Sequence, residues 1–342
     1  MTHQAAWSDG KGRNVEVRTV TTPTPGPGEL LIKVEVIAFS PIESKMQRFE
    51  THPVKYPYVS GLSFAGIVES MGTGVDKFAP GDRVTTLRPE STLEDARWGG
   101  FQQFAIAAPE STAKLPIGVS LEDGAATIMN LASISSALSL HADLRRPSLA
   151  EPAPPIDEKV LIYGGSSSSG GLAICYAKAA GYKVITTSSP RNRSHVGSLK
   201  PDHIIDHTQP HAEIVSEIAS NGPYKCIFDA IGLPPVTSIM VEYLKGIGGC
   251  HYLAFIPPLP GTIPIPANIT REFDSFGWTL EKNADFKKWF YEELLPRGLA
   301  SGVIKPTPTR WLEGGLGGVQ EALDLMGDGK VSGQKLVLNP WS

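Results

Sequence analysis

Residue types suited to phosphate binding occur together in the run Gly164-Gly165-Ser166-Ser167-Ser168-Ser169-Gly170. Glycine permits a tight turn and lets backbone N–H groups approach a pyrophosphate, and serine hydroxyls add hydrogen bonds to it. The run follows a short apolar strand pattern at 159–163 and precedes a helical pattern at 172–180. A glycine-rich turn between a strand and a helix is the context in which dinucleotides bind. The run therefore predicts a cofactor loop; the alternative is a flexible serine-rich loop that binds nothing.

The end of the following strand distinguishes between the two nicotinamide dinucleotides. An NAD-binding unit has Asp or Glu there, about 20 residues after the glycines, to hold the ribose 2′-hydroxyl. Here the strand ends in Thr186-Thr187-Ser188-Ser189-Pro190-Arg191-Asn192-Arg193, which has arginines and no acid. Guanidinium and hydroxyl groups suit a 2′-phosphate. The segment predicts NADPH rather than NADH, with Arg191 a better candidate than Arg193, which also fits a solvent-facing loop.

Strands and helices that alternate from about residue 158 must position this loop. Short apolar strands are expected at 182–187, 204–206, 226–229 and 249–255, with helices between them. Strands that alternate with helices in this way predict a parallel, doubly wound sheet, and hence an α/β fold class.

The chain before residue 126 is typical of β-rich structure. Strands are expected at 29–37 and 64–70, and a turn at 80–84 enters a third strand. Closely spaced glycines favour a compact, partly open barrel with tight corners. A helical pattern follows at 121–140, and the proline-rich segment after it predicts a surface loop.

Two domains are expected, because 342 residues exceed the ~250–300 residues at which a single core stops growing. After Pro266 the chain is expected to return to the first domain. Helices near 285–295 and 318–326 and a strand at 335–338 would complete that domain. The predicted boundaries are 1–126 together with 284–342 for the first domain, and 127–283 for the second.

Charge and composition argue against several classes of partner. The formal net charge is −4 without runs of like charge, which disfavours nucleic acid and polybasic membrane contacts. The start of the chain lacks a signal-peptide pattern, and no window approaches the ~18 apolar residues of a membrane span. Cys175, Cys226 and Cys250 lack metal-site or disulfide spacing, which favours a reducing compartment. We expect a cytoplasmic protein.

Along nearly its whole length the chain resembles the medium-chain dehydrogenase/reductase superfamily. The resemblance rests on the cofactor loop and on the runs Pro25-Gly26-Pro27-Gly28-Glu29-Leu30-Leu31-Ile32-Lys33-Val34, Gly66-Ile67-Val68-Glu69-Ser70-Met71-Gly72-Thr73-Gly74-Val75 and Gly81-Asp82-Arg83-Val84. Within it the chain is most similar to fungal trans-acting enoyl reductases of the lovastatin type, through Ser40-Pro41-Ile42-Glu43-Ser44-Lys45-Met46, Tyr163-Gly164-Gly165-Ser166, Ser189-Pro190-Arg191-Asn192, Gly248-Gly249-Cys250-His251-Tyr252 and Ser332-Gly333-Gln334-Lys335-Leu336-Val337. The resemblance implies a GroES-like catalytic domain and a Rossmann NADPH-binding domain.

The superfamily also includes zinc alcohol dehydrogenases, whose catalytic site needs about three Cys, His or Glu ligands. Where those enzymes have a Cys after the second barrel strand, this chain has Ser40-Pro41. Where they have Gly-His-Glu before the next strand, it has Gly61-Leu62-Ser63, and the lobe with four closely spaced cysteines is absent. The comparison implies a zinc-independent enzyme.

Without a metal, the chemistry that fits best is hydride addition to a carbon–carbon double bond conjugated to a carbonyl. The protein must place the substrate over the nicotinamide and supply a donor to the developing enolate. The resemblance implies that Lys45 lies at the active site, where it contacts the cofactor or the acyl part of the substrate. The alternative is an exposed lysine that makes no contact.

Two further polar groups are considered for the substrate pocket. Ser135 resembles the hydroxyl residue that lines this pocket in the family, with Ser136 as the alternative because the register is uncertain by one or two residues. The tyrosine acid of some zinc-free relatives has no clear match, since its place falls near His52–Pro53. The neighbouring Tyr56 and Tyr58 are interpreted as packing residues, and no proton donor is assigned.

The remaining cofactor contacts follow from the motifs. His207 occupies the place of a tyrosine near the 2′-phosphate, Ala254 and Phe255 end the last strand near the nicotinamide, and Ser332 and Gly333 reach back from the C-terminal segment. Phe255 is almost equally well explained as a core aromatic residue. The full predicted cofactor-binding set is Lys45, Gly165, Ser166, Ser167, Ser168, Ser169, Ser188, Ser189, Arg191, Asn192, His207, Ala254, Phe255, Ser332 and Gly333.

These features together imply an NADPH-dependent reductase of a conjugated double bond in fungal secondary metabolism. The substrate would be a small or carrier-tethered enoyl compound, and the implied partner is a polyketide synthase, with no nucleic acid or membrane. One alternative is a quinone or small-enone oxidoreductase. The other is a non-catalytic NADPH-binding protein on the same scaffold.

Overall fold

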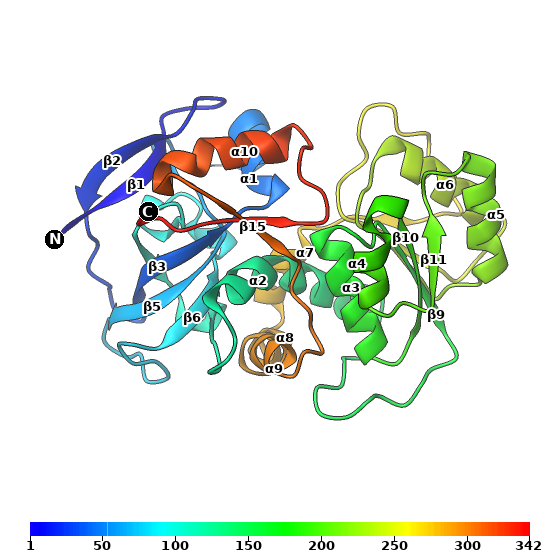
Figure 1. Ribbon diagram of the computed structural model, residues 1–342, viewed down its shortest axis with the longest axis horizontal. Helices are drawn as coiled ribbons and strands as arrows, with labels where there is room; N and C mark the ends of the chain where they lie inside the picture. Colours follow the sequence, from blue (N-terminus) through cyan, green and yellow to red (C-terminus); the bar gives the residue numbers. More distant parts are fainter. Residues whose placement is uncertain (53) are drawn as a thin grey trace. The chain divides into compact units, whose positions relative to one another are not determined.

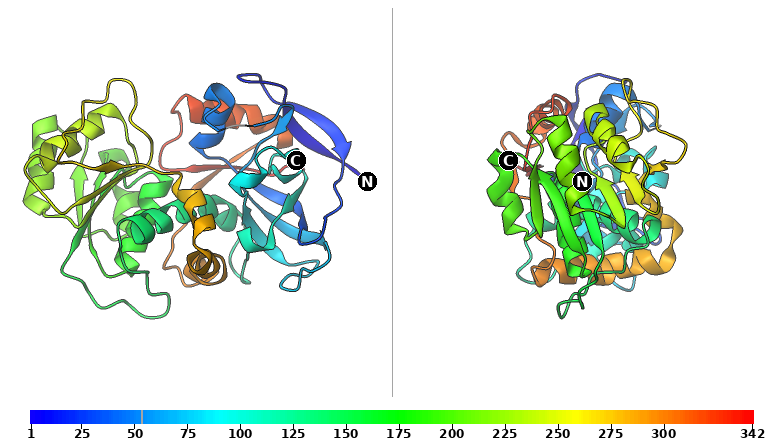
Figure 2. Two further views of the ribbon diagram at one scale, coloured as in Figure 1. Left: turned by 180° about the vertical axis from the view of Figure 1, so that it is seen from behind. Right: turned by 90° about the vertical axis from the view of Figure 1, so that its right-hand side faces the viewer.

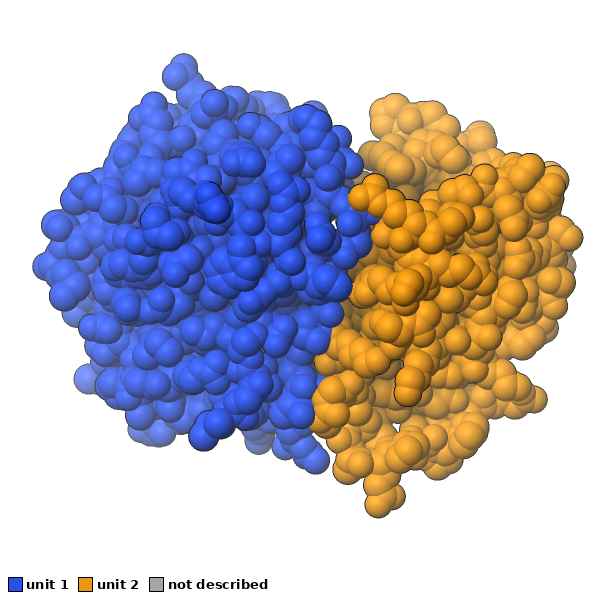
Figure 3. Space-filling view, in the orientation of Figure 1, with its two compact units in different colours: residues 1–129, 281–300, 306–342 blue, residues 130–280, 301–305 orange. Residues whose placement is uncertain are grey.

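The computed structural model describes residues 1–52 and 54–342, and it divides into two compact units (Figures 1 and 3). Unit 1 consists of Met1–Met129, Glu281–Ala300 and Pro306–Ser342. Unit 2 consists of Asn130–Leu280 and Ser301–Lys305. The short excursion at Ser301–Lys305 is a feature for which the sequence offered no signal.

Unit 1 is built on two β-sheets. The larger has seven strands, in the order β15-β16-β3-β5-β6-β8 with β7 paired to β3, and the smaller has the order β2-β1-β4. In the larger sheet only β15 and β16 are parallel to each other. The strands are β1 Thr2–Ser8, β2 Glu16–Thr21, β3 Leu30–Ala38, β4 Tyr58–Val59, β5 Ser63–Met71, β6 Arg83–Leu87, β7 Phe104–Ala107, β8 Thr112–Lys114, β15 Thr309–Leu312 and β16 Lys335–Leu338.

The central strand β3 is almost entirely apolar, and its side chains contribute to the core of unit 1. Ile32 and Val34 are buried there with Phe64 of β5. The pairing of β3 with β5 shifts register between Leu31 and Ile32 and again between Val34 and Val36. Such bulges bend a strand, which agrees with the expected barrel-like sheet.

Helices α1 and α10 pack against each other in unit 1 (Figure 1). The Gln47 amide donates to Gln320 Oε1 at 2.9 Å, and Arg48 makes ion pairs with Asp324 and Asp328. The helices of the unit are α1 Pro41–Phe49, α8 Ala284–Trp289, α9 Leu295–Ala300 and α10 Val319–Gly327, with shorter turns η1 Glu90–Thr92, η2 Ala96–Trp98, η3 Pro109–Ser111, η7 Phe290–Leu294 and η8 Gly315–Gly318. Helix α2, Leu121–Ser136, begins in unit 1 and ends in unit 2.

Unit 2 contains one six-stranded parallel sheet in the order β11-β10-β9-β12-β13-β14, with helices along both faces (Figure 2). The central strands are short and almost wholly buried, as expected where helices cover both faces. The elements are β9 Lys159–Tyr163, α3 Ser168–Ala179, β10 Lys183–Ser188, η5 Pro190–Asn192, α4 Arg193–Ser198, β11 His203–Asp206, α5 His211–Asn221, β12 Cys226–Asp229, α6 Pro234–Leu244, β13 His251–Ala254, β14 Arg271–Glu272 and α7 Phe276–Thr279, with turns η4 Ala137–His141 and η6 Leu280–Lys282, the second at the border with unit 1. The predicted α/β class with a doubly wound sheet is confirmed.

The chain returns to unit 1 at Glu281, after Pro266 and three residues before the predicted start of the last stretch at 284. Strand β14 pairs in parallel with β13, and unit 2 extends to Leu280. Arg271 holds this edge strand, since its guanidinium donates to the carbonyl of Ile256 at 2.9 Å and lies 5.9 Å from the Tyr252 ring. A two-residue strand is too short to show an apolar pattern in the sequence. None of the helices in the described part of the chain is long and apolar enough to span a bilayer.

Candidate active site

The glycine-rich run forms a tight turn between β9 and α3 in unit 2. Gly164 adopts a φ of 89°, which favours glycine. A Cβ atom on Gly170 would lie 2.1 Å from the carbonyl oxygen of Gly164, so only glycine lets α3 begin so close to β9. The first N–H groups of a helix lack intrahelical acceptors. The N–H groups of Ser168 and Ser169 also have no acceptor elsewhere in the described chain, so they are free to bind an anion.

The four serine hydroxyls of the loop have different surroundings. Ser167 is the N-cap of α3: its hydroxyl accepts from the Gly170 amide at 3.0 Å and donates to the Gly164 carbonyl at 2.8 Å. Ser169 is buried, and its hydroxyl accepts from the side chain of Asn130. Ser166 and Ser168 are half-buried, and no hydrogen bond to their hydroxyls occurs within the described residues. Only these two hydroxyls remain available to a phosphate.

The end of β10 presents a free guanidinium at the edge of the sheet. Arg191 is exposed, and its side chain makes no hydrogen bond or ion pair within the described residues. Arg193 instead donates to the carbonyl of Ile204 at 3.3 Å. This difference supports the prediction that Arg191, rather than Arg193, is the candidate for a 2′-phosphate.

Around Arg191 lie the other residues predicted to meet the adenosine end of the cofactor. The Ser188 hydroxyl is buried and donates to the carbonyl of Ser189 at 3.0 Å. Ser189 is half-buried, as is Asn192. The His207 amide donates to the Ser188 carbonyl at 3.3 Å, and its ring lies 6.4 Å from that of Tyr163.

A buried carboxylate organises the same edge of the sheet at the end of β12. Asp229 accepts from the amides of Ile231 and Gly232 at 3.0 and 2.8 Å and from the Tyr252 hydroxyl at 3.2 Å. Burial raises the pKa of the Asp229 carboxyl, and these hydrogen bonds oppose the shift. Sequence reasoning missed this residue, although an acid at the end of a buried apolar strand was a usable signal.

Ala254 and Phe255 follow at the end of β13. Ala254 is buried and lies opposite Asp229 in the pairing of β12 with β13. Phe255 donates its amide to the Asp229 carbonyl at 2.9 Å. Its ring meets the Phe228 ring edge-on at 5.9 Å, which gives it a packing role as well. The edge of the sheet therefore brings together the predicted cofactor residues of unit 2.

The predicted pocket serine lies on α2. Ser135 is fully buried, and its hydroxyl donates to the Ala132 carbonyl one turn earlier at 3.1 Å. The Ser136 hydroxyl is also buried but has no hydrogen-bond partner in the described residues. Of the two, only Ser136 has a hydroxyl without a hydrogen-bond partner within the described residues.

Lys45 lies on α1 in unit 1 and is half-buried. Burial lowers the pKa of its ammonium below the usual range, and the described residues offer it no hydrogen-bond or ion-pair partner. A half-buried cation without a partner has the character expected of a ligand-binding group. Ser332 and Gly333 also belong to unit 1, directly before β16, where Ser332 is exposed and Gly333 has a φ of 66°.

The region expected for a tyrosine acid follows α1. Pro53 lies outside the described residues, and His52 is half-buried with a pKa lowered by burial. Tyr58 is buried and its hydroxyl accepts from Arg88 at 3.3 Å, in line with a packing role. Tyr56 is half-buried and lines a small cavity.

The segments that correspond to zinc-ligand positions meet at a buried junction in unit 1. Glu43 of α1 accepts from the backbone amides of Ser40 and Leu62, and the Lys335 ammonium of β16 donates to the Ser40 hydroxyl. Within the described residues, no three His, Cys, Asp or Glu side chains are grouped as metal ligands would be. Sequence reasoning missed the roles of Glu43 and Lys335, because each charge lies in a motif that carries no sign of burial.

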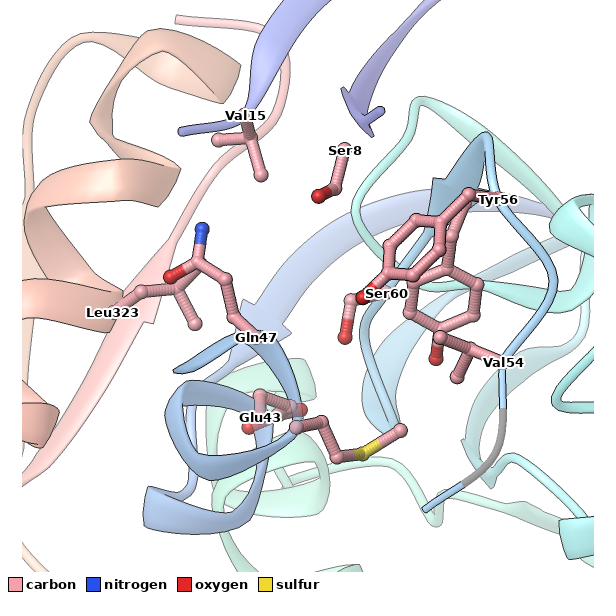
Figure 4. Close-up of a pocket in the computed structure, with 10 residues that line it drawn as sticks. Ser8, Val15, Glu43, Gln47, Val54, Tyr56, Ser60 and Leu323 are labelled. Carbon is pink, nitrogen blue, oxygen red and sulfur yellow. The ribbon is translucent and has the colours of Figure 1, made fainter. Parts of the chain in front are cut away.

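The carboxylate of Glu43 also borders a cavity of about 20 Å³ between α1 and the segment before β5 (Figure 4). Gln47, Tyr56 and Ser60 are among the other lining residues. Most of the wall of this cavity is apolar. Burial raises the pKa of the Glu43 carboxyl to about 7, while both amide hydrogen bonds and the charge of Lys335 act in the opposite direction.

Known proteins show similarity to the whole chain. The family model of the alcohol dehydrogenase GroES-like domain matches residues 26–117. The trans-enoyl reductase himH of Aspergillus japonicus is 31% identical over 340 residues, which cover 98% of this chain and 97% of that protein.

Solved structures share the fold across both units. A quinone oxidoreductase of Pseudomonas syringae pv. Tomato DC3000 superposes with a TM-score of 0.76 at 20% identity, over 99% of this chain and all of that one. The mycobacterial protein Rv1454c, solved in complex with NADPH, gives a TM-score of 0.75 at 20% identity with the same coverage.

Proposed function

Because the chain belongs to the medium-chain dehydrogenase/reductase superfamily, close to its fungal trans-enoyl reductases, we propose that it is an NADPH-dependent, zinc-independent enoyl reductase. The proposed substrate is a carbon–carbon double bond conjugated to a carbonyl. We further propose that it acts in polyketide metabolism on an enoyl group carried by a synthase, which extends the resemblance of the chain to trans-acting enoyl reductases.

The observation that carries the NADPH part of the proposal is the carboxyl edge of the parallel sheet. The free amides of Ser168 and Ser169 suit the pyrophosphate, and the unpartnered guanidinium of Arg191 suits a 2′-phosphate. Gly170 lets the start of α3 lie against the loop backbone, since a side chain there would collide with the Gly164 carbonyl. The end of β10 carries no acidic side chain, which would repel the 2′-phosphate.

The chemistry that NADPH supplies is a hydride for the β-carbon of the enoyl group, which places negative charge on the carbonyl oxygen and calls for a proton at the α-carbon. Lys45 is the proposed group that orients the acyl part of the substrate or the cofactor. A half-buried ammonium also stabilises developing negative charge more effectively than one in water.

Zinc independence is proposed from the residues at the junction of Ser40, Leu62 and Lys335. A serine hydroxyl and a leucine side chain stand where ligands would be needed, and the Ser40 hydroxyl is already bonded to an ammonium. A positively charged group at this place disfavours a metal cation.

The test is a measurement of NADPH oxidation with purified protein and three substrate panels: enoyl thioesters of pantetheine, small enones, and quinones. The proposal expects the highest kcat/KM with enoyl thioesters, lower values with NADH, and no loss of activity after treatment with a zinc chelator. A preference for quinones would establish the quinone oxidoreductase reading instead. Tight NADPH binding without turnover on any panel would indicate a non-catalytic binding protein.

A further inference from the structure

Two charged side chains are buried together beneath the start of α1. Lys335 is 2% exposed and Glu43 is 1% exposed, although neither residue type is commonly buried. They come from opposite ends of unit 1, since Glu43 lies on α1 and Lys335 begins β16. Their burial calls for a compensating arrangement, because an isolated charge is strongly destabilising inside a protein.

Hydrogen bonds to Ser40, the residue that precedes α1, provide this compensation. Its hydroxyl accepts from the Lys335 ammonium at 2.6 Å, and its backbone amide donates to Glu43 Oε2 at 2.6 Å. The second carboxylate oxygen of Glu43 accepts from the Leu62 amide at 3.0 Å. One ammonium and one carboxylate thus join three segments: the start of α1, the turn before β5, and β16.

These contacts fix the first turn of α1 in position. The other polar ties of the helix within the described residues lie toward its far end. The Gln47 side chain donates to Gln320 and to the Arg13 carbonyl, the Gln47 carbonyl accepts from the Gly12 amide, and Arg48 makes partly exposed ion pairs. Exposed ion pairs contribute little to the position of a helix, whereas a buried hydrogen-bonded charge restricts it strongly. The first turn of α1 is therefore held chiefly by Glu43 and Lys335.

Lys45 lies one turn after Ser40 on this helix and has no polar partner of its own in the described chain. With no polar partner to hold its ammonium, Lys45 follows the position of α1. We propose that Lys335 and Glu43 are positioning residues, which fix the first turn of α1 and thereby place the Lys45 ammonium for the reaction. The catalytic part of this inference rests on the proposed function, in which Lys45 meets the substrate or the cofactor.

The test replaces Lys335 with Met, which keeps an unbranched side chain one atom shorter and removes its charge. Lys330→Met is the matched control, because Lys330 is an exposed lysine in the same segment, paired with Asp328 at the surface. Lysines are reductively methylated with ¹³C, and the Lys45 signal is identified by its absence from Lys45→Arg. The Lys45 pKa is then read from its titration, beside kcat and KM for an enoyl thioester.

In folded Lys335→Met, the Lys45 pKa is expected to rise toward 10.5 and kcat to fall at least tenfold, while KM for NADPH changes little. Lys330→Met is expected to match the wild type in both the Lys45 pKa and kcat. An unchanged Lys45 titration in folded Lys335→Met would overturn the proposal and leave Lys335 a stabilising residue only.

A second variant covers the case in which Lys335→Met does not fold. The double variant Glu43→Gln with Lys335→Met removes both charges at once and leaves neither buried alone, so it is expected to fold. A Lys45 pKa that differs from the wild-type value in this double variant supports the proposal, and a wild-type Lys45 pKa refutes it. If the wild type reduces no enoyl substrate but the Lys45 titration responds as expected, the proposed function fails and the positioning of Lys45 stands.

Discussion

The side-chain amide of Asn130 donates a 2.9 Å hydrogen bond to the hydroxyl oxygen of Ser169, 39 residues further along the chain. The last serine of the cofactor loop is therefore held by α2 rather than offered to a ligand. Together with the capping role of Ser167, this bond gives two of the four serines a structural function. In the proposed function this loop would bind phosphate mainly through backbone amides, which the hydrogen bonds of Ser167 and Ser169 help to keep in place.

Replacement of Arg191 by Ala should weaken NADPH binding and leave NADH binding unchanged. A charge-assisted hydrogen bond contributes about 1.5–3 kcal/mol, so the Kd for NADPH should rise roughly tenfold to hundredfold. Arg193→Ala is the control, because that guanidinium already bonds the Ile204 carbonyl. Titration of both dinucleotides by fluorescence measures the effect. Equal losses for NADPH and NADH in Arg191→Ala would remove the 2′-phosphate role.

Two adjacent glycines at the start of α3 should respond very differently to alanine. In Gly170→Ala the new Cβ would lie 2.1 Å from the Gly164 carbonyl oxygen, whereas in Gly171→Ala the nearest atom is 3.3 Å away, on the Leu199 side chain. Overpacking of this kind costs about 1–3 kcal/mol. Gly170→Ala should lower the free energy of unfolding by that amount and abolish NADPH binding. Similar binding by both variants, measured by calorimetry, would show that the loop does not need this close approach.

Loss of the Lys45 ammonium should reduce turnover without loss of the fold. In Lys45→Met we expect kcat/KM for an enoyl thioester to fall about tenfold or more, as when one stabilising charge is removed from a reaction site. Lys11→Met is the control, because Lys11 is an exposed lysine paired with Glu50. Thermal unfolding curves should coincide for all three proteins. Wild-type kinetics in Lys45→Met would show that Lys45 takes no part in the reaction.

The raised pKa of Glu43 makes stability depend on pH in a defined direction. The carboxyl titrates near 4.5 when unfolded and at about 7 when folded, so its favourable contribution is complete below pH 4.5 and is lost as the pH rises through 7. Relative to Glu43→Gln, the wild type should lose on the order of 1–3 kcal/mol of unfolding free energy between those values. Urea unfolding at pH 5, 6 and 7 measures this. A constant difference between the two proteins would show that Glu43 stays ionised throughout.

Much of the fold was predictable because it depends on local patterns. Apolar runs and glycine turns indicated β3, β5 and the cofactor strands β9, β10 and β12 at nearly their observed positions. The helix after the loop begins at Ser168, earlier than expected, because Ser167 caps it within the serine run. Strand β14 was missed, since its two residues pair only through a partner brought by tertiary structure.

The site was predictable where it depends on residue type and local order, and unpredictable where it depends on burial. The sequence shows two arginines and no acid after β10. It does not show that the Arg193 side chain bonds the Ile204 carbonyl while the Arg191 side chain has no such partner in the described residues. Lys335 follows an ordinary Ser-Gly-Gln turn, and its sequence neighbours do not show that it meets Ser40. Contacts between residues so far apart leave no periodic pattern in the chain.

The arrangement of unit 1 in three separate stretches has a consequence for synthesis on the ribosome. Ser40, Glu43 and Leu62 emerge early, whereas Lys335 emerges 295 residues after Ser40, once the whole of unit 2 has been translated. Until then the nascent first unit holds a carboxylate without its cation and a sheet without β16. The N-terminal stretch therefore cannot reach its final stability during translation, and unit 2, which is nearly continuous in the chain, has the opportunity to fold first.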